Sequence, residues 1–162
     1  MPNDQQAIEQ DIIDYFSRIR DQFTRQDILS EWAQAVESSI LRNFVVGGRY
    51  SLIGSWLGGQ KKWKPLAAST IRARKRQGYY PIHILRRQSL LMNSIAVRTT
   101  STGILMTASQ HFPHVHQYGA RIKATKRGGG GTYEFDIPAR PFLVIQPEDI
   151  DELRDIILDR LR

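Results

Sequence analysis

The first apolar pattern in the chain has the spacing of a helix. Apolar residues recur every three or four positions from Ile8 to Ile19, with acids and amides between them. This spacing predicts an amphipathic helix, for which Asn3 or Asp4 could serve as the N-terminal cap. We assign residues 1–25 to this N-terminal helix.

A second and longer helical pattern follows. Thr24 and Asp27 have the spacing of a capping box, and Gly47-Gly48 supplies a stop. Its apolar stripe consists of Ile28, Trp32, Val36, Ile40 and Phe44. We expect both stripes to face the core or a neighbouring subunit.

Two short helices are predicted in the middle of the chain. The first runs from Ser69, as its N-cap, to Gln77, and Gly78 stops it. The second is a helical turn or two over residues 89–94. Both are too short to build a core alone.

The period changes from helical to alternating after residue 94. Residues 95–100 and 104–108 alternate in polarity across a threonine–glycine turn, which predicts two antiparallel strands. Residues 132–137 alternate cleanly, and residues 142–145 are predicted to form a short apolar strand.

The last pattern is again helical. Pro147 and Glu148 suit its first turn and Arg160 suits its last. Its buried stripe is predicted to be Ile150, Leu153, Ile157 and Leu161. Together the elements predict a single α+β domain, with N- and C-terminal helices packed on a small, mainly antiparallel β-sheet.

Two segments interrupt this scheme. Residues 47–62 are glycine-rich, yet Tyr50, Trp56 and Leu57 make them too apolar for a plain linker. They either fold onto the core or form a partner-binding patch, and we favour a patch that is mobile in the free protomer. Residues 121–131 are expected to form a basic loop that ends in four glycines.

Composition adds a possible anionic partner. The 162 residues suffice for one domain with its own core, and 23 Lys and Arg against 16 Asp and Glu leave a net charge of +7. Such an excess favours nucleic acid as a partner, although it also suits a merely soluble basic protein. Bases concentrate, with aromatic residues between them, at Lys61, Lys62, Lys64, Arg72, Arg74, Lys75, Arg76, Arg86 and Arg87. Interleaved aromatics suit nucleic-acid contact, and a solvated helix face explains the same bases.

Several kinds of chemistry do not fit this sequence. Cysteine is absent, which excludes disulfides, zinc–thiolate sites and thiol nucleophiles. The glycines at 128–131 follow their basic residues and precede a strand, the reverse of a P-loop, so we predict no nucleotide cofactor. Neither a serine–histidine–acid order nor a pair of carboxylates stands out, so we predict that the protein is not an enzyme. Residues 1–10 are polar and no apolar run approaches the length of a membrane span, which predicts neither a signal peptide nor an anchor.

The histidines form one cluster. His111, His114 and His116 lie within six residues, and in an extended segment the last two would share a face. A metal site would need a third ligand and a carboxylate that the neighbouring sequence does not supply. We therefore predict no metal, and expect a histidine to order the loop through its ring nitrogens.

Three short motifs occur in a particular order. Trp63-Lys64-Pro65-Leu66 comes first, before Ser69-Thr70-Ile71 and a run of bases; His116-Gln117-Tyr118-Gly119 follows, and then Ile137-Pro138-Ala139-Arg140-Pro141-Phe142-Leu143. In this order and at these spacings the chain resembles the phage virion morphogenesis family, the tail-completion proteins of Mu-like and P2-like contractile-tailed phages. The resemblance covers residues 26–162. It departs from the family pattern at the apolar 47–59 insertion and at residues 85–91, where a glycine turn is usual.

The resemblance implies a structural virion protein without catalytic residues or cofactors. It implies a homo-oligomeric, hexameric ring at the head–tail junction, with neck, connector, tail-terminator or tail-tube proteins as partners. The protein would be found in the host cytoplasm during assembly and then in the virion. In such a ring we expect Lys123, Lys126 and Arg127 to line the lumen and touch the phosphates of passing DNA, or else to pair with acids of an adjacent subunit.

Five residues are predicted to contact a neighbouring subunit or partner. They are Tyr50, Trp56, Leu57, Trp63 and Arg140. Prolines on either side of Arg140 stiffen the backbone, which would present its guanidinium for a bidentate contact with a carboxylate. The alternative function is a stand-alone basic nucleic-acid-binding protein, and a small nuclease, which would need an acidic metal site, comes third.

Overall fold

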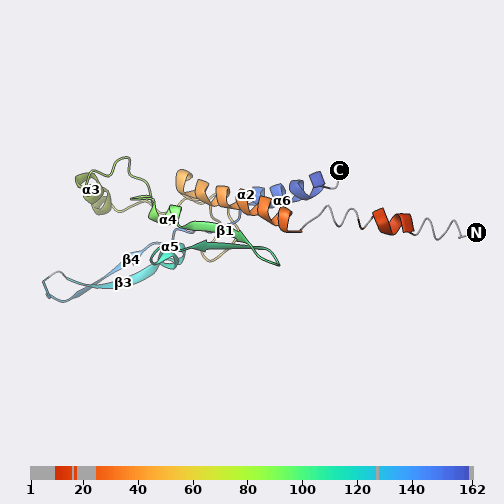
Figure 1. Ribbon diagram of the computed structural model, residues 1–162. Helices are drawn as coiled ribbons and strands as arrows, with labels where there is room; N and C mark the ends of the chain where they lie inside the picture. The colour runs from red at the N-terminus through yellow and green to blue at the C-terminus, as the bar shows by residue number, and fades with distance from the viewer. Residues whose placement is uncertain (1–9, 16, 18–24, 127, 161–162) are drawn as a thin grey trace, which may run out of the picture.

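The longest element of the fold is a helix, α2 (Arg25–Val46). The computed structural model describes residues 10–15, 17, 25–126 and 128–160, and Figure 1 shows them as an elongated molecule with α2 along its upper side. α2 ends at the predicted stop, because Gly47 has a φ of +79° and its N–H donates to the Asn43 carbonyl at 3.0 Å. Residues 10–15 and 17 are helical, as predicted for the first helix, and the rest of that helix lies outside the described residues.

Four strands form two small antiparallel pairs. β1 (Ile95–Thr99) pairs with β2 (Ile104–Ala108), and β3 (Ala120–Thr125) pairs with β4 (Thr132–Ile137). The β3–β4 hairpin projects from one end of the molecule (Figure 1). The α+β prediction is confirmed, with two two-stranded sheets in the part of the chain that the structure describes.

The basic loop is shorter than predicted. Residues 121–125 belong to β3, so only residues 126–131 connect the two strands. The cause is the alternation of Ile122 and Ala124 with charged residues, which lets them pair with Phe135 and Tyr133 across the hairpin.

The short elements correct three further predictions. α3 (Ala68–Arg76) begins after Ala67, so Ser69 lies inside the first turn and is not its N-cap. α4 (Leu90–Asn93) confirms the helical turn at 89–94, whereas α5 (Pro113–Tyr118) forms where a loop was expected. Residues 142–145 are not a strand, since only Ile145 makes an isolated bridge, to Leu57.

The last helix is α6 (Pro147–Arg160), which begins where predicted. Its predicted stripe is wrong in part: Ile150 and Ile157 are 42% and 37% exposed, and Leu153 is half-buried. Leu161 lies outside the described residues.

Hydrogen bonds at the start of α6 set its rotation. The Asp149 carboxylate accepts the Gln146 N–H at 2.8 Å, and the Asp149 carbonyl accepts the indole N–H of Trp32 at 2.9 Å. These bonds turn Asp149 toward α2, so the helix is rotated by one position, about 100°, from the arrangement that would bury its apolar stripe.

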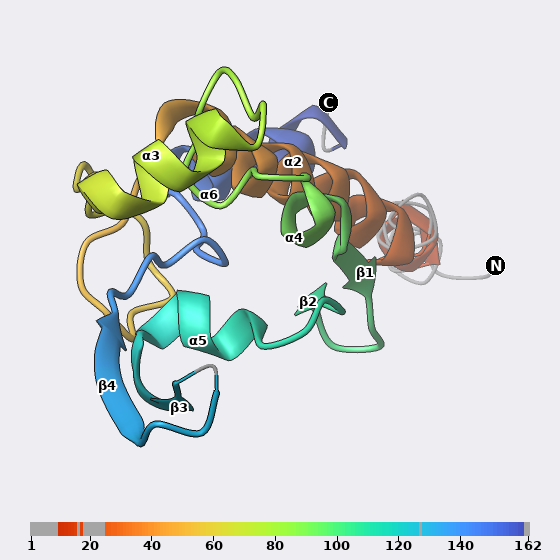
Figure 2. The ribbon, with the colours of Figure 1, turned by 90° about the vertical axis from the view of Figure 1, so that its left-hand side faces the viewer.

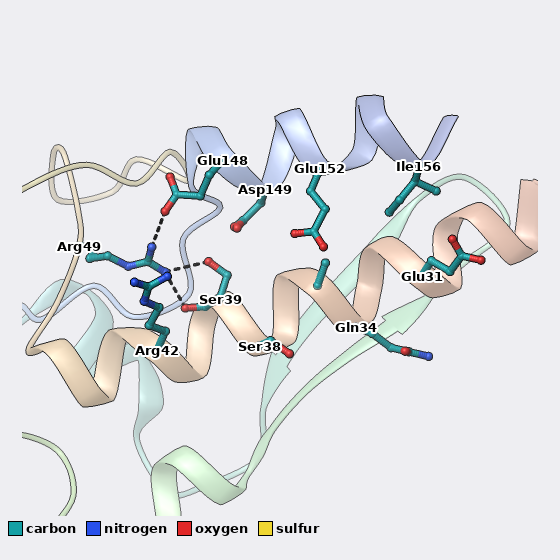
Figure 3. A pocket seen from close by; sticks show the side chains of 11 residues that line it. Glu31, Gln34, Ser38, Ser39, Arg42, Arg49, Glu148, Asp149, Glu152 and Ile156 are labelled. Carbon is teal, nitrogen blue, oxygen red and sulfur yellow. Dashed lines mark hydrogen bonds and ion pairs between the residues drawn. The ribbon is translucent and has the colours of Figure 1, made fainter. Parts of the chain in front are cut away.

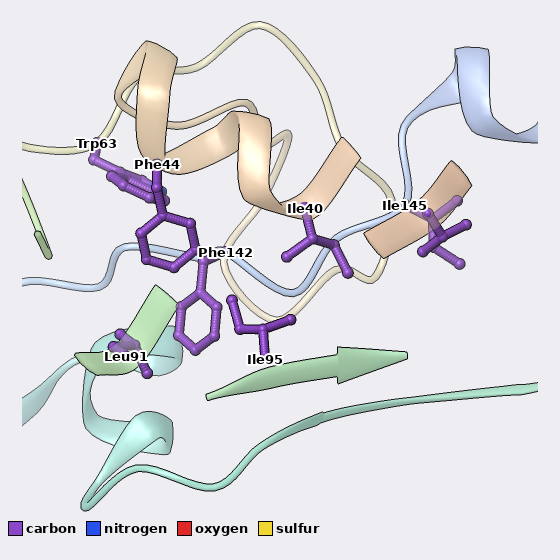
Figure 4. Packing of buried hydrophobic residues seen from close by; sticks show 8 residues of the cluster. Ile40, Phe44, Trp63, Leu91, Ile95, Phe142 and Ile145 are labelled. Atoms are coloured by element: carbon purple, nitrogen blue, oxygen red, sulfur yellow. The ribbon is translucent and has the colours of Figure 1, made fainter. Parts of the chain in front are cut away.

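The core lies beneath α2 and gathers side chains from the whole length of the chain. It contains Val36, Ile40, Phe44, Trp63, Leu91, Ile95, Phe142 and Ile145 (Figure 4). The Phe44 ring lies 5.4 Å from that of Trp63 and 5.6 Å from that of Phe142. Such aromatic pairs add to the stability given by apolar burial. Among the described residues, no helix is long and apolar enough to cross a membrane.

Candidate functional site

The first and third sequence motifs meet inside the molecule. Trp63 is 2% exposed, and its indole N–H donates to the Pro141 carbonyl at 2.7 Å. Arg140 donates through Nε to the Lys64 carbonyl at 3.1 Å and through Nη2 to the Pro65 carbonyl at 3.3 Å. A tryptophan and an arginine thus tie two segments together that are far apart in the sequence.

The second motif joins the same junction. The Gln117 side chain accepts the N–H groups of Phe142 at 3.0 Å and Leu143 at 3.1 Å, and donates to the Leu143 carbonyl at 3.2 Å. The Arg140 N–H donates to the His116 carbonyl at 2.7 Å. Gly119 has a φ of +78°, and a Cβ there would lie 2.9 Å from the Ala139 nitrogen, so the approach requires glycine. All three motifs therefore build one buried junction.

This junction corrects two of the predicted contact residues. Trp63 and Arg140 are both buried within the protomer, and Arg140 bonds backbone carbonyls where we expected a carboxylate. Burial, and then the charge of Arg74, lower the pKa of Arg140. The surface available to a partner therefore excludes both residues.

The histidines do not form the predicted loop. His114 and His116 lie on α5, where positions two apart point about 200° from each other around the helix. His114 is exposed, while His116 is half-buried and its Nδ1 lacks a hydrogen-bond partner. Burial, and then the charge of Arg140, lower the pKa of His116. No group of three potential metal ligands occurs among the described residues.

The glycine-rich 47–62 segment is fastened at its base and exposed at its tip. Tyr50 and Lys61 exchange both backbone hydrogen bonds, at 3.2 and 3.0 Å, and Tyr50 packs against the core. At the tip the exposed fractions are 64% for Leu52, 59% for Ile53 and 61% for Trp56. Leu57, at 37%, lies where the segment returns to Ile145, so the apolar surface comprises Leu52, Ile53, Trp56 and Leu57. We name it the apolar tip.

The basic residues around α3 form an exposed surface. α3 stands apart from the rest of the fold at the same end of the molecule as the hairpin (Figures 1 and 2). Arg72, Lys75 and Arg76 are exposed, and Arg74 donates to the His83 carbonyl at 2.7 Å. Burial, and then the nearby charge of Arg87, lower the pKa of Arg74. Like charges are thus held close together, which an anionic partner would relieve.

The β3–β4 hairpin has one charged and one apolar face. Arg121 and Asp136 are paired across the strands at 2.9 Å, and Lys123 lies opposite Glu134. The rings of Tyr133 and Phe135 stack on the other face, 5.8 Å apart. Toward the tip of the hairpin, Lys126 is exposed and has no acid opposite it in the strand register. Arg127 lies outside the described residues.

Acidic and basic residues are distributed unevenly along the sequence, which the short motifs did not reveal. No acidic residue lies between Glu37 and Glu134. That stretch holds 16 of the 23 basic residues, so the remaining parts of the chain carry seven basic residues against all 16 acidic ones. Counting charge along the sequence, instead of over the whole chain, would have revealed it.

The acidic side of the molecule contains a groove between α2 and α6. The groove has a volume of about 540 Å³ and is lined by residues that include Glu31, Glu148 and Glu152 (Figure 3). Arg49 closes one end, where its guanidinium bonds Glu148 at 2.5 Å and the Ser39 carbonyl at 2.8 Å. Asp149 lies at the bottom, and burial raises the pKa of its carboxyl.

These features define a class of protein: a small α+β subunit with a buried junction and exposed projections, suited to contacts with other macromolecules. A family model described as the phage virion morphogenesis family matches residues 59–162. The chain therefore belongs to the phage virion morphogenesis family, a structural family, and is a virion-associated morphogenesis protein. The resemblance is confirmed over residues 59–162, and the apolar tip lies outside the match. No curated protein and no solved structure matches the chain.

Proposed function

We propose that this protein is a ring-forming tail-completion or neck subunit, which joins the phage tail to the capsid and leaves a passage for DNA. The supporting observation is the division of the molecule into one buried junction and three projections. The junction unites the three sequence motifs, and the projections are the apolar tip, α3 and the β3–β4 hairpin. A fixed core with projecting elements suits a subunit that must contact several neighbours at once.

Each projection has a chemistry that fits a ring at the head–tail junction. The apolar tip would bury its side chains against a neighbouring subunit or a connector or tail protein. The apolar face of the hairpin, formed by Tyr133 and Phe135, would do the same. The hairpin tip, with Lys126 and Arg127, would then point into the lumen toward DNA phosphates. We propose six copies, as the resemblance to the tail-completion proteins of contractile-tailed phages implies.

The experiment that tests this function is a phage that lacks the protein. We expect its lysate to contain filled heads and complete tails that do not join, seen by electron microscopy. Purified wild-type protein added to the lysate should restore joined particles. Normal virions in the absence of the protein would show that it has another role.

A mass measurement tests the ring. The purified protein should sediment as a hexamer, alone or after addition of the phage's own neck and tail proteins. A protein that remains monomeric under both conditions, and is absent from the purified neck, would contradict the ring.

One observation favours a second function. The stretch between Glu37 and Glu134 has no acidic residue, which suits a stand-alone nucleic-acid-binding protein. Such a protein would bind DNA as a monomer, and virions would still form without it. The lysate experiment above therefore separates the two functions.

A further inference from the structure

α3 has no partner within the protomer that would explain its stability. It is a helix of nine residues with no buried side chain and no side-chain cap at its N-terminus. Helices shorter than about 12 residues are marginal in water unless tertiary packing supports them. Within the part of the chain that the structure describes, α3 is held chiefly by loop contacts such as the bond from Arg74 to His83.

The charge of α3 indicates what would cover it. Its exposed side chains include Arg72, Lys75 and Arg76, and no acidic residue occurs in this part of the sequence to neutralise them. A surface that matches α3 must therefore be acidic. It must also come from another molecule, because the acids at this end of the chain, Glu134 and Asp136, already lie opposite Lys123 and Arg121 on the hairpin.

The acids of the protomer gather at the opposite end. On α6 they include Asp151, Glu152 and Asp155, which are exposed, and Glu31 on α2 lies across the groove from them. Figure 1 shows α3 at one end of the molecule, and α6 with the first turns of α2 at the other. The protomer is thus basic at one end and acidic at the other.

We infer that α3 of one copy docks against the acidic α2–α6 face of the next copy. Because the two surfaces are different and lie at opposite ends, each copy presents a free basic end and a free acidic end. Contacts of this head-to-tail kind repeat, and they close into a ring when the rotation from one copy to the next completes a full turn. This inference rests on the proposed function for the existence of a ring, and it names the surfaces that would build it.

A second copy accounts for more of the structure than DNA does. DNA would neutralise α3 but would leave the negative charge that remains on the α2–α6 face after Arg154 pairs with Asp151 and Asp155, and Arg160 pairs with Glu31. A symmetric dimer through α3 would place like charges opposite each other, which is destabilising. Head-to-tail contact satisfies both ends of every protomer in the same step.

Charge reversal tests the docking. We expect the basic-end variant Arg72→Glu/Lys75→Glu/Arg76→Glu to associate at least tenfold more weakly than wild type. The acidic-face variant Asp151→Lys/Glu152→Lys/Asp155→Lys should behave in the same way. Both sets of changes in one chain, or an equimolar mixture of the two variants, should restore association. Added NaCl should weaken association of the wild type, because the contact is electrostatic.

Two controls accompany this comparison. Arg98→Glu, at an exposed position of β1, makes the same change of charge as Arg72→Glu alone; it should leave association unchanged, whereas Arg72→Glu should weaken it. Far-ultraviolet circular dichroism and urea unfolding should show that every variant is folded.

Cross-linking tests the geometry without altering charge. Since the chain has no cysteine, Ser69→Cys on α3 and Ser38→Cys beside the groove provide unique attachment sites. In a mixture of the two single variants, a short bis-maleimide should join Cys-substituted position 69 of one copy to position 38 of another, as identified by mass spectrometry. The same link is sought in virions from phage that carry both substitutions.

The outcomes separate this inference from the proposed function. Association that survives both charge reversals, or virions that contain only 69–69 links or no links, would overturn the docking but not the ring. Loss of DNA binding without loss of association in the basic-end variant would assign α3 to DNA instead. Joined virions formed without the protein would overturn the proposed function itself.

Discussion

Gln117 shows how one side chain can organise several segments of a chain. Its carboxamide accepts two backbone N–H groups and donates to one carbonyl of the segment that follows Pro141. An amide is suited to this role, because it carries both a donor and an acceptor without charge. Leucine of similar size would leave two buried N–H groups, those of Phe142 and Leu143, without partners.

Arg140 is expected to stabilise the fold through its bonds to two backbone carbonyls. We expect Arg140→Met to lower the free energy of unfolding by about 2 kcal/mol, because the carbonyls of Lys64 and Pro65 lose their charged donor. Urea denaturation measures the change. The control Arg98→Met, at an exposed position of β1, should change stability by less than about 0.5 kcal/mol. Equal effects from both substitutions would show that the Arg140 contacts contribute little.

His116 gives a prediction about pH. Its pKa is lowered in the folded protein, so below about pH 6.5 the unfolded chain binds a proton that the folded chain does not. Stability should therefore fall as the pH drops from about 6.5 toward the folded-state pKa. The variant His116→Gln should show a shallower fall over this window in urea denaturations at successive pH values. The matched variant His114→Gln, at an exposed position, should follow the wild type.

Residue type alone did not reveal which residues of the motifs are buried. Trp63 stands among lysines, which suggested a surface for binding, and yet it fills the core beside Phe44. The burial of Trp63 depends on a hydrogen bond to a distant carbonyl, that of Pro141, and no local sequence pattern contains that information. The exposure of Trp56 did follow from sequence, because glycines surround it and no helical or alternating pattern gives it a buried face.

The β3–β4 hairpin is expected to contribute to the binding of DNA. We expect Lys123→Gln/Lys126→Gln/Arg127→Gln to lower the affinity for DNA and to reduce its salt dependence, because fewer phosphates are neutralised. Association of the subunits should persist. DNA titrations at several salt concentrations, together with sedimentation, measure both properties. A failure to associate would show that the hairpin belongs to a subunit interface.

The apolar tip is expected to contribute to binding and not to the stability of the free protein. We expect Leu52→Ser/Trp56→Ser to change stability by less than about 0.5 kcal/mol, because both side chains are mainly exposed in the protomer. Binding to a neighbouring subunit or neck protein should weaken in pull-down or sedimentation experiments. Hydrogen exchange in a verified monomer provides an independent measure, and strong protection of residues 52–56 would contradict their role as a free surface.

Sequence patterns predicted long elements better than short ones. α2 and β4 each carry a complete period, so their bounds follow from the pattern. β3 had the alternation of a strand, which its charged residues obscured. α5 has only six residues, of which Pro113 is the first, and these are too few to show a helical period. The rotation of α6 was not predictable, because it depends on the distant contact between Trp32 and Asp149.

The stability and the association of the protein are expected not to depend on a metal ion. We expect dialysis against EDTA to leave the melting temperature and the state of association unchanged. The physical reason is that the fold depends on apolar packing and on hydrogen bonds of the buried junction, while the described residues contain no group of three potential metal ligands. Stoichiometric zinc or manganese in protein purified without an affinity resin would contradict this expectation.

The division of charge is a property of the molecule and not of any one element. It places basic α3 and acidic α6 at opposite ends, although each helix alone looks like an ordinary solvated surface. The net charge of +7 conceals this division, because it adds the two ends together. A value for the whole chain suggested an anionic partner, whereas the arrangement in space also provides an anionic surface, to which the basic end of a second copy would be complementary.

The place of the buried junction in the chain has a consequence for synthesis on the ribosome. Asn43 at the end of α2 bonds Phe142, which is 99 residues later. At about 5 to 20 residues per second, translation needs roughly 5 to 20 s to supply that partner. During this time Phe44 on α2 can pack on Trp63 but not yet on Phe142, so the nascent chain cannot complete its core. The subunit therefore acquires its final surfaces only near the end of translation, and neighbours that recognise those surfaces can join it only afterwards.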